Sequence, residues 1–152
     1  MNENVMIRKA VATDLESINR LEQLCFNEES FSRNQLRYLI TRAKADFLVI
    51  EESGTIGGFI VLLKRTTSTG LRIYSVAVSP HHRGKGLARE LLNEAEKRAR
   101  LNGKRFLTLE VSEVNHHAIG LYRQSGFEVF GQRPAYYKDG SKALLMRKPV
   151  PA

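Results

Sequence analysis

The sequence contains little that would permit a covalent cross-link or a membrane anchor. Its 152 residues include one cysteine, Cys25, so no disulfide can form within the chain. No apolar run approaches the length of a membrane-spanning helix, and the first ten residues, MNENVMIRKA, lack the apolar core of a signal peptide. These absences predict a cytoplasmic protein that does not enter a membrane. Cys25 falls in an apolar helical pattern and is expected to be a buried structural thiol.

Positive charge is in excess but is not concentrated. The chain carries 24 Lys and Arg against 16 Asp and Glu, a formal net charge of +8. This excess favours polyanionic partners such as nucleic acid, a ribosome or a phosphorylated cofactor. The basic tail or aromatic-interleaved basic run of a dedicated nucleic-acid module is missing, so no DNA partner is predicted. Length and a hydrophobic fraction of 42% predict one domain over residues 1–152.

Apolar spacing predicts an α+β fold with the order βααβββαβαββ. Strands are expected near residues 4–10, 46–52, 55–65, 71–78, 105–111, 127–133 and 142–148, and helices from about residues 13, 32, 87 and 115. The first helix should bury the face formed by Leu15, Ile18, Leu21, Leu24 and Cys25. The three central strands should form an antiparallel meander. The strand–helix–strand unit that follows should place its two strands parallel.

The stretch SPHHRGKGLA connects the last strand of the meander to the third helix. Gly84 and Gly86 let the backbone approach a ligand closely, and the first amides of the helix lack partners within it. With Arg83 and Lys85 as mobile cations, this turn predicts a phosphate or pyrophosphate site. A loop that leads into a helix and has a solvated basic rim would have the same composition. The glycine spacing and the residue after Lys85 exclude the phosphate loops typical of ATP and NAD sites.

Two motifs in this part of the chain resemble those of the GNAT N-acetyltransferases. The first family motif, Arg/Gln-x-x-Gly-x-Gly/Ala, is matched by Arg83, Gly86 and Ala88. The second, Asn-x-x-Ala-x-x-Leu-Tyr followed by Gly-Phe, is matched by Asn115, Ala118, Leu121, Tyr122, Gly126 and Phe127. The motifs stand in the family's order, and the predicted elements match its fold over essentially the whole chain. The resemblance implies a GNAT fold, with a mixed, mostly antiparallel, splayed sheet flanked by helices.

The resemblance also implies a place for acetyl-CoA, the acetyl donor. In the family the pantetheine arm inserts between the strands expected at residues 71–78 and 105–111. Backbone groups of Val76, Ala77 and Val78 would then bind the pantetheine and the thioester. The pyrophosphate would lie on the turn formed by Arg83, Gly84, Lys85, Gly86, Leu87 and Ala88. Asn115 and Tyr122 would add further contacts to the cofactor, although Asn115 equally suits the cap of its helix.

Acetyl transfer to an amine requires a neutral amine, a stabilised oxyanion and a proton for the departing thiolate. Glu110 is the best candidate for the base, because it lies inside the apolar run FLTLEV, where an unpaired charge is costly. In the family context Glu110 is the general base and Tyr122 the general acid. An ion pair with a neighbouring strand would also explain Glu110, and core packing would also explain Tyr122.

Glu110 and Tyr122, together with the later YY, DG and ALLM sequences, resemble the RimI-type subgroup, the ribosomal-protein alanine N-acetyltransferases. Members of this subgroup acetylate protein N-termini. The early stretch CFNEESFSRNQL resembles a segment that helps to shape their acceptor site. Phe31, Glu110, Tyr136 and Tyr137 are therefore expected at the acceptor, with ordinary strand packing as the alternative for one of the two tyrosines.

Two dipeptides depart from residues common in that subgroup: Ser112-Glu113 and His116-His117. Either dipeptide can alter the choice of acceptor. The histidine pairs do not predict a metal site, because adjacent histidines point apart and lack Cys or acidic residues at ligand spacing.

The sequence therefore predicts an acetyl-CoA-dependent N-acetyltransferase for the α-amine of a protein N-terminus, with ribosomal proteins among the candidate acceptors. Two alternatives remain. The same chemistry would serve a small-molecule amine or a lysine side chain. A basic RNA- or ribosome-binding protein would use the same fold without catalysis. The sequence indicates no oligomeric state.

Overall fold

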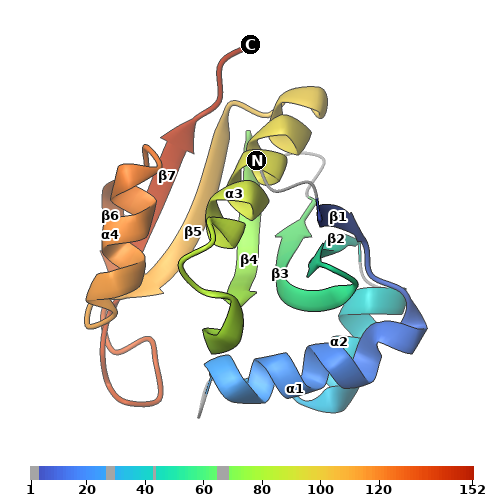
Figure 1. Ribbon diagram of the computed structural model, residues 1–152. Helices are drawn as coiled ribbons and strands as arrows, with labels where there is room; N and C mark the ends of the chain where they lie inside the picture. Colours follow the sequence, from blue (N-terminus) through green and yellow to red (C-terminus); the bar gives the residue numbers. More distant parts are fainter. Residues whose placement is uncertain (1–3, 27–29, 43, 65–68) are drawn as a thin grey trace. The chain divides into compact units, whose positions relative to one another are not determined.

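The computed structural model describes residues 4–26, 30–42, 44–64 and 69–152. Within these ranges the elements follow in the predicted order (Figure 1). They are β1 (Val5–Lys9), α1 (Leu15–Cys25), α2 (Arg33–Thr41), β2 (Ala45–Glu52), β3 (Thr55–Leu63), β4 (Gly70–Val78), α3 (Leu87–Leu101), β5 (Phe106–Ser112), α4 (His116–Gln124), β6 (Glu128–Arg133) and β7 (Ala143–Pro149). Short 3-10 turns at Ala12–Asp14 and Pro80–His82 precede α1 and α3.

The strands pair in the order β1-β2-β3-β4-β5-β7-β6. The pairs β1/β2, β2/β3, β5/β7 and β6/β7 are antiparallel, and β4/β5 is parallel. The α+β class and the mixed, mostly antiparallel sheet are thus confirmed. The parallel register joins Gly70 to Phe106, Leu71 to Leu107 and Arg72 to Thr108.

The chain divides into two compact units, each built from two segments. The first unit contains residues 1–64 and 75–91, and the second contains residues 65–74 and 92–152. The chain passes from one unit to the other inside β4 and again inside α3. A single domain over residues 1–152 remains a prediction.

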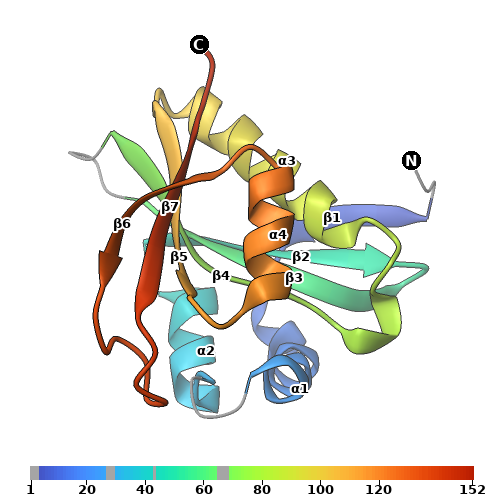
Figure 2. The same cartoon turned by 90° about the vertical axis from the view of Figure 1, so that its left-hand side faces the viewer.

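In the first unit, α1 and α2 lie on one side of β2 and β3 (Figure 2). Alternate strand residues Phe47, Val49, Phe59 and Val61 are buried in the cluster that contains the apolar residues of both helices. The intervening residues, including Leu48 and Ile60, are also buried. Because successive side chains point to opposite faces, both faces of this strand pair are covered. The turn between them uses Ser53 and Gly54 at φ of +51° and +84°.

The predicted apolar face of α1 is partly wrong. Leu15, Ile18 and Leu21 are buried as expected, but Leu24 is 58% exposed and Glu22 is buried in its place. Glu22 has a partner inside the protein, because the Phe31 N–H donates a 2.7 Å hydrogen bond to Glu22 Oε2.

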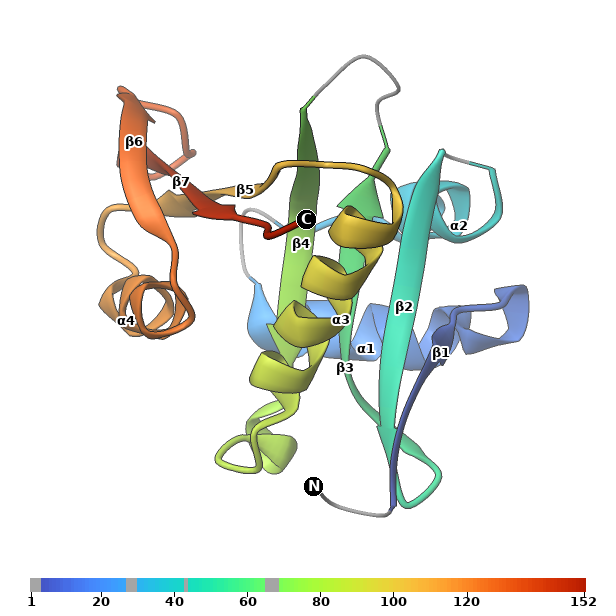
Figure 3. The same cartoon turned by 90° about the horizontal axis from the view of Figure 1, so that it is seen from above.

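The second unit contains β5, β6 and β7 with α4, which Figure 3 shows in orange and red. In β5 the buried residues Leu107, Leu109 and Val111 alternate with more exposed ones. Tyr122 of α4 packs edge-on against Phe127, with 5.8 Å between the ring centroids. Among the described residues no helix is both long and apolar enough to cross a lipid bilayer.

Candidate active site

The end of β4 and the turn that follows contain the residues predicted to bind the cofactor, and they lie in the first unit. The Val78 carbonyl accepts from the Arg83 Nε atom at 3.3 Å and from the Cys25 Sγ atom at 3.4 Å. Ala77 is buried. Both contacts fix the carbonyl end of the strand segment that the sequence assigns to pantetheine. Cys25 itself is half-buried rather than enclosed, and burial raises the pKa of its thiol.

The backbone of the turn is suited to an anion. Gly84 and Gly86 have φ values of +81° and +79°, in the left-handed region that disfavours residues with a Cβ. A Cβ built on either glycine would meet no atom within 4 Å. The space beside the turn is therefore open, and α3 begins at the next residue, Leu87, with its N-terminal amides. This geometry fits a pyrophosphate group.

The two cations of the turn are less mobile than predicted. Lys85 Nζ lies 2.7 Å from Glu52 Oε1, and Arg83 is held by the Val78 carbonyl. Glu52 sits at the end of β2, so an acidic partner from another strand restrains Lys85. The backbone amides of this turn are held by the fold, and the two side chains have partners of their own.

Gly57 and Gly58 of β3 were missed by the sequence analysis. A Cβ on Gly58 would lie 2.7 Å from the Ala77 carbonyl oxygen, and one on Gly57 would lie 2.9 Å from the His82 ring. Ser79 N also donates to the Gly57 carbonyl at 2.8 Å. These two glycines let β3 approach the end of β4 closely. The sequence did contain a sign of this close approach, because two adjacent glycines inside an apolar strand indicate that another backbone lies near.

The second unit contains the predicted base. Glu110 lies on β5, and its Oε1 atom is 3.1 Å from Arg72 Nη2 on β4. The ion pair considered as an alternative from sequence is therefore present. The Glu110 side chain is 13% exposed, and its Oε2 atom is enclosed without a hydrogen bond of normal geometry among the described residues. One carboxylate oxygen is thus held more firmly than the other.

The predicted acid, Tyr122, is 8% exposed. Burial, together with the influence of Tyr137, raises the pKa of Tyr122 well above its usual value, so the hydroxyl keeps its proton at neutral pH. The ring also packs against Phe127. Core packing and proton donation use different parts of the side chain and are compatible.

Tyr136 and Tyr137 form an edge-to-face pair with ring centroids 5.0 Å apart. Tyr136 is 45% exposed. Hydrogen bonding to the Glu110 carboxylate is the main cause of a raised pKa at Tyr136. The structure therefore brings Glu110 and the exposed Tyr136 together, with Arg72 as a third member that the sequence did not suggest.

Two other predicted residues have structural partners. Asn115 caps α4, since its Oδ1 atom accepts from the Ala118 N–H at 3.2 Å. Phe31 is half-buried against the core of the first unit, with its N–H on Glu22. Within the expected acceptor segment CFNEESFSRNQL, residues 27–29 lie outside the described residues.

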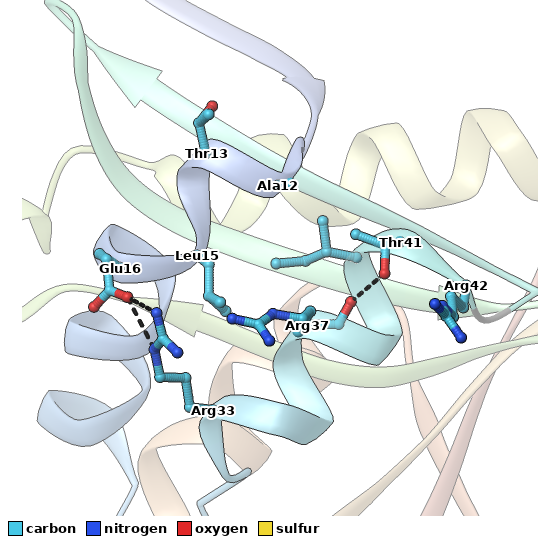
Figure 4. A pocket seen from close by; sticks show the side chains of 9 residues that line it. Ala12, Thr13, Leu15, Glu16, Arg33, Arg37, Thr41 and Arg42 are labelled. Atoms are coloured by element: carbon cyan, nitrogen blue, oxygen red, sulfur yellow. Dashed lines mark hydrogen bonds and ion pairs between the residues drawn. The ribbon is translucent and has the colours of Figure 1, made fainter.

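A separate pocket of about 380 Å³ lies in the first unit, at the start of α1 and along α2 (Figure 4). Its rim includes an ion pair between Arg33 and Glu16, and its floor includes Leu15 and Ile40. None of the predicted site residues lines it. Within the described part of the chain, no group of three His, Cys, Asp or Glu side chains is arranged to hold a metal ion.

The element order and the glycine turn between β4 and α3 define an acyltransferase of the GNAT type. Residues 15–127 match the Acetyltransferase (GNAT) family, and the chain belongs to this family. It is an N-acetyltransferase that uses acetyl-CoA as its donor, as the sequence predicted.

Several known proteins resemble the chain. Streptothricin acetyltransferase of Streptomyces lavendulae is 37% identical over 109 residues, which cover 69% of this chain and 58% of that protein. A Bacillus subtilis (strain 168) protein described as a candidate ribosomal protein bS18-alanine N-acetyltransferase is 29% identical over 147 residues, 96% of each chain. The crystal structure of Ard1 from Thermoplasma volcanium is 28% identical, covers 98% of this chain and 99% of that one, and has a TM-score of 0.86.

Proposed function

We propose that this N-acetyltransferase acts on the α-amine of a protein N-terminus. The observation that carries the proposal is the arrangement of Glu110 beside the exposed ring of Tyr136. The carboxylate can bind the α-amine of a peptide, and the exposed aromatic ring can contact the residues that follow that amine. Similarity to the Bacillus subtilis protein over nearly its full length supports the same acceptor class, with ribosomal proteins as candidates. A cytoplasmic location is part of the proposal.

Most of the groups proposed to hold acetyl-CoA are backbone groups of residues 76–88. Amides at Gly84, Gly86 and the start of α3 receive the pyrophosphate. The backbone of Val76–Val78 receives the pantetheine, and an N–H near Val78 stabilises the oxyanion that forms as the amine attacks. Asn115 contributes a side-chain contact in addition to its role as a cap.

Glu110 and Tyr122 are the proposed acid–base groups. Glu110 removes a proton from the incoming ammonium, directly or through water, with its less firmly held Oε2 atom as the acceptor. The amine nitrogen then bonds to the thioester carbon, and the carbon–sulfur bond breaks as the intermediate collapses. Tyr122 gives its proton to the departing thiolate, and the second proton lost by the nitrogen returns to Tyr122 through water. The products are the acetylated amine, coenzyme A and the proton taken by Glu110, so the reaction balances without a metal or an oxidant.

A second candidate acceptor is a small-molecule amine. It is favoured by the 37% identity to streptothricin acetyltransferase, although the chain covers only 58% of that protein. With this acceptor the donor and the roles of Glu110 and Tyr122 would be the same. Only the molecule bound beside Tyr136 would differ. Membership of an acetyltransferase family counts against the non-catalytic RNA-binding alternative.

The test is a mass-spectrometric acetylation assay with purified protein, acetyl-CoA and a mixed acceptor panel. The panel contains peptides with free N-termini, N-terminally blocked peptides with internal lysines, and small polyamines. We expect acetate on the peptide α-amine, with a preference for certain first residues, and little product with the Glu110→Gln variant. Acetate only on lysines or small amines would overturn the N-terminal assignment and leave the enzyme class intact.

A further inference from the structure

The residues that follow β5 hold the loop that carries Tyr136 and Tyr137. This loop, residues 134–142, connects β6 to β7. Inside it, the Ser141 carbonyl accepts from the N–H groups of Tyr136 at 3.0 Å and Tyr137 at 3.1 Å. Asp139 Oδ1 in turn accepts from the Ser141 N–H and from its hydroxyl, at 2.8 and 2.6 Å. Ser141 is thus the residue through which the backbone positions of both tyrosines are set.

Ser112 and Glu113 attach this loop to the end of β5. The Ser112 and Ser141 Oγ atoms are 2.8 Å apart. Glu113 Oε2 accepts from the Lys142 N–H at 2.7 Å, and the Glu113 N–H donates to the Lys142 carbonyl at 3.0 Å. The β5–β7 ladder has its last pair at Ser112 and Ala143, so these contacts continue the connection beyond the ladder. Two of the three contacts depend on the side chains.

The attachment closes a ring of contacts around the predicted base. Glu110 and Ser112 are two residues apart on β5 and therefore project from the same face of the strand. The Glu110 carboxylate raises the pKa of Tyr136, so these two groups are neighbours. The Tyr136 N–H donates to the Ser141 carbonyl, and the Ser141 hydroxyl lies beside the Ser112 hydroxyl. A loop of nine residues would otherwise leave an exposed tyrosine many orientations, because loops carry little packing of their own.

We propose that Ser112 and Glu113 are positioning residues for the acceptor amine, which fix the Tyr136 hydroxyl against the Glu110 carboxylate and so determine which amines reach it. The proposal rests on the proposed function, in which Glu110 acts on the acceptor. Neither residue touches the donor in this scheme. They act through Ser141 and Tyr136 on acceptor affinity and choice.

Two matched pairs of variants distinguish the loss of a hydrogen bond from a change in side-chain size. Ser112→Ala and Glu113→Ala each remove a contact. Ser112→Thr keeps the hydroxyl, and Glu113→Gln keeps an oxygen that accepts from Lys142. For the Ala variants we expect KM for the acceptor to rise about tenfold, because the free energy of one lost hydrogen bond of this kind corresponds to such a change in affinity. KM for acetyl-CoA should stay within about twofold of the wild-type value. The conservative variants, Ser112→Thr and Glu113→Gln, should restore most of the affinity. Glu128→Ala, at an exposed carboxylate outside the loop, is the control.

An ultraviolet titration of tyrosine gives a readout that needs no acceptor. In the double variant S112A/E113A, one tyrosine should ionise at lower pH than in the wild type, and the difference should vanish in a Tyr136→Phe background. Unchanged titration and unchanged acceptor KM in the double variant would overturn the proposal. So would an equal rise of both KM values with a lower melting temperature. If the wild type acetylates no amine in the panel, the proposed function fails, and the titration still decides whether Ser112 and Glu113 orient Tyr136.

Discussion

Arg72 Nη2 and Glu110 Oε1 lie 3.1 Å apart on neighbouring parallel strands, and the Arg72 guanidinium also stacks 5.3 Å from the centre of the Tyr74 ring. The arginine therefore has a fixed place beside the predicted base. It holds one side of the carboxylate and leaves the Oε2 atom less firmly bound. In the proposed mechanism the Oε2 atom takes the proton of the incoming ammonium.

Replacement of Glu110 by Gln should reduce kcat/KM by about a hundredfold or more, because the amide keeps the size of the side chain and cannot take a proton. Steady-state kinetics test this expectation. Wild-type rates in Glu110→Gln would remove Glu110 from the mechanism.

Arg72→Met should lower kcat/KM, because the guanidinium that holds the Glu110 Oε1 atom at 3.1 Å is lost. Arg72→Lys keeps the charge without the planar guanidinium and should show a smaller loss. Steady-state kinetics of the two variants, measured side by side, are the test. Identical kcat/KM for Arg72→Met and wild type would show that the ion pair has no part in acceptor deprotonation.

Much of the fold followed from local patterns in the sequence. The order of the elements and the cap at Asn115 depend on residues close together in the chain, and these agree with the structure. The Arg72–Glu110 pair depends instead on the parallel register of β4 and β5. The register between two distant strands cannot be predicted from the sequence of either strand alone.

The exposure of Leu24 and the burial of Glu22 have the same origin. Helical spacing put Leu24 on the apolar face of α1, and nothing near Glu22 in the sequence indicates a partner. The partner is the N–H of Phe31, nine residues further on, beyond the end of the helix. Similarly, the contacts of Ser112 and Glu113 are with Ser141 and Lys142, which only the β5–β7 pairing brings close.

Tyr122→Phe should lower kcat by at least about tenfold and leave the Kd for acetyl-CoA within about twofold, because only the proton on the hydroxyl is removed. The ring contact with Phe127 persists, so the melting temperature should change little. Single-turnover kinetics and isothermal calorimetry measure the two quantities separately. Loss of acetyl-CoA binding with unchanged chemistry would assign Tyr122 to binding alone.

Gly58→Ala should destabilise the protein by about 1–3 kcal/mol and raise KM for acetyl-CoA, since the added Cβ would lie 2.7 Å from the backbone oxygen of Ala77. That oxygen belongs to the segment proposed to bind pantetheine. The matched control is Gly120→Ala in α4, where a Cβ meets nothing within 4 Å. Urea unfolding should give an equal or higher stability for Gly120→Ala, because alanine favours a helix. Equal stability for Gly58→Ala and wild type would contradict the close strand approach.

The stability of the protein should fall as pH rises from 5 to 8, because of Glu22. This carboxyl is 1% exposed, and burial raises the pKa of Glu22 to about 7, although the Phe31 N–H opposes the shift. A carboxyl whose pKa is higher in the folded than in the unfolded state binds more protons when folded, so its stabilisation is complete at low pH and is lost as pH rises through about 7. The loss between pH 5 and 8 should be about 2 kcal/mol.

Glu22→Gln should remove most of this slope, because the amide stays neutral and its oxygen still accepts from Phe31. Cys25, whose pKa is raised by burial, stays a thiol over the same range and adds no slope of its own. Glu16→Gln, on the exposed side of the same helix, should retain the wild-type slope. Urea denaturation at pH 5, 6, 7 and 8 compares the three proteins. If Glu22→Gln and wild type lose the same free energy of unfolding between pH 5 and 8, the pH dependence belongs to another group, and the buried carboxyl is ionised throughout.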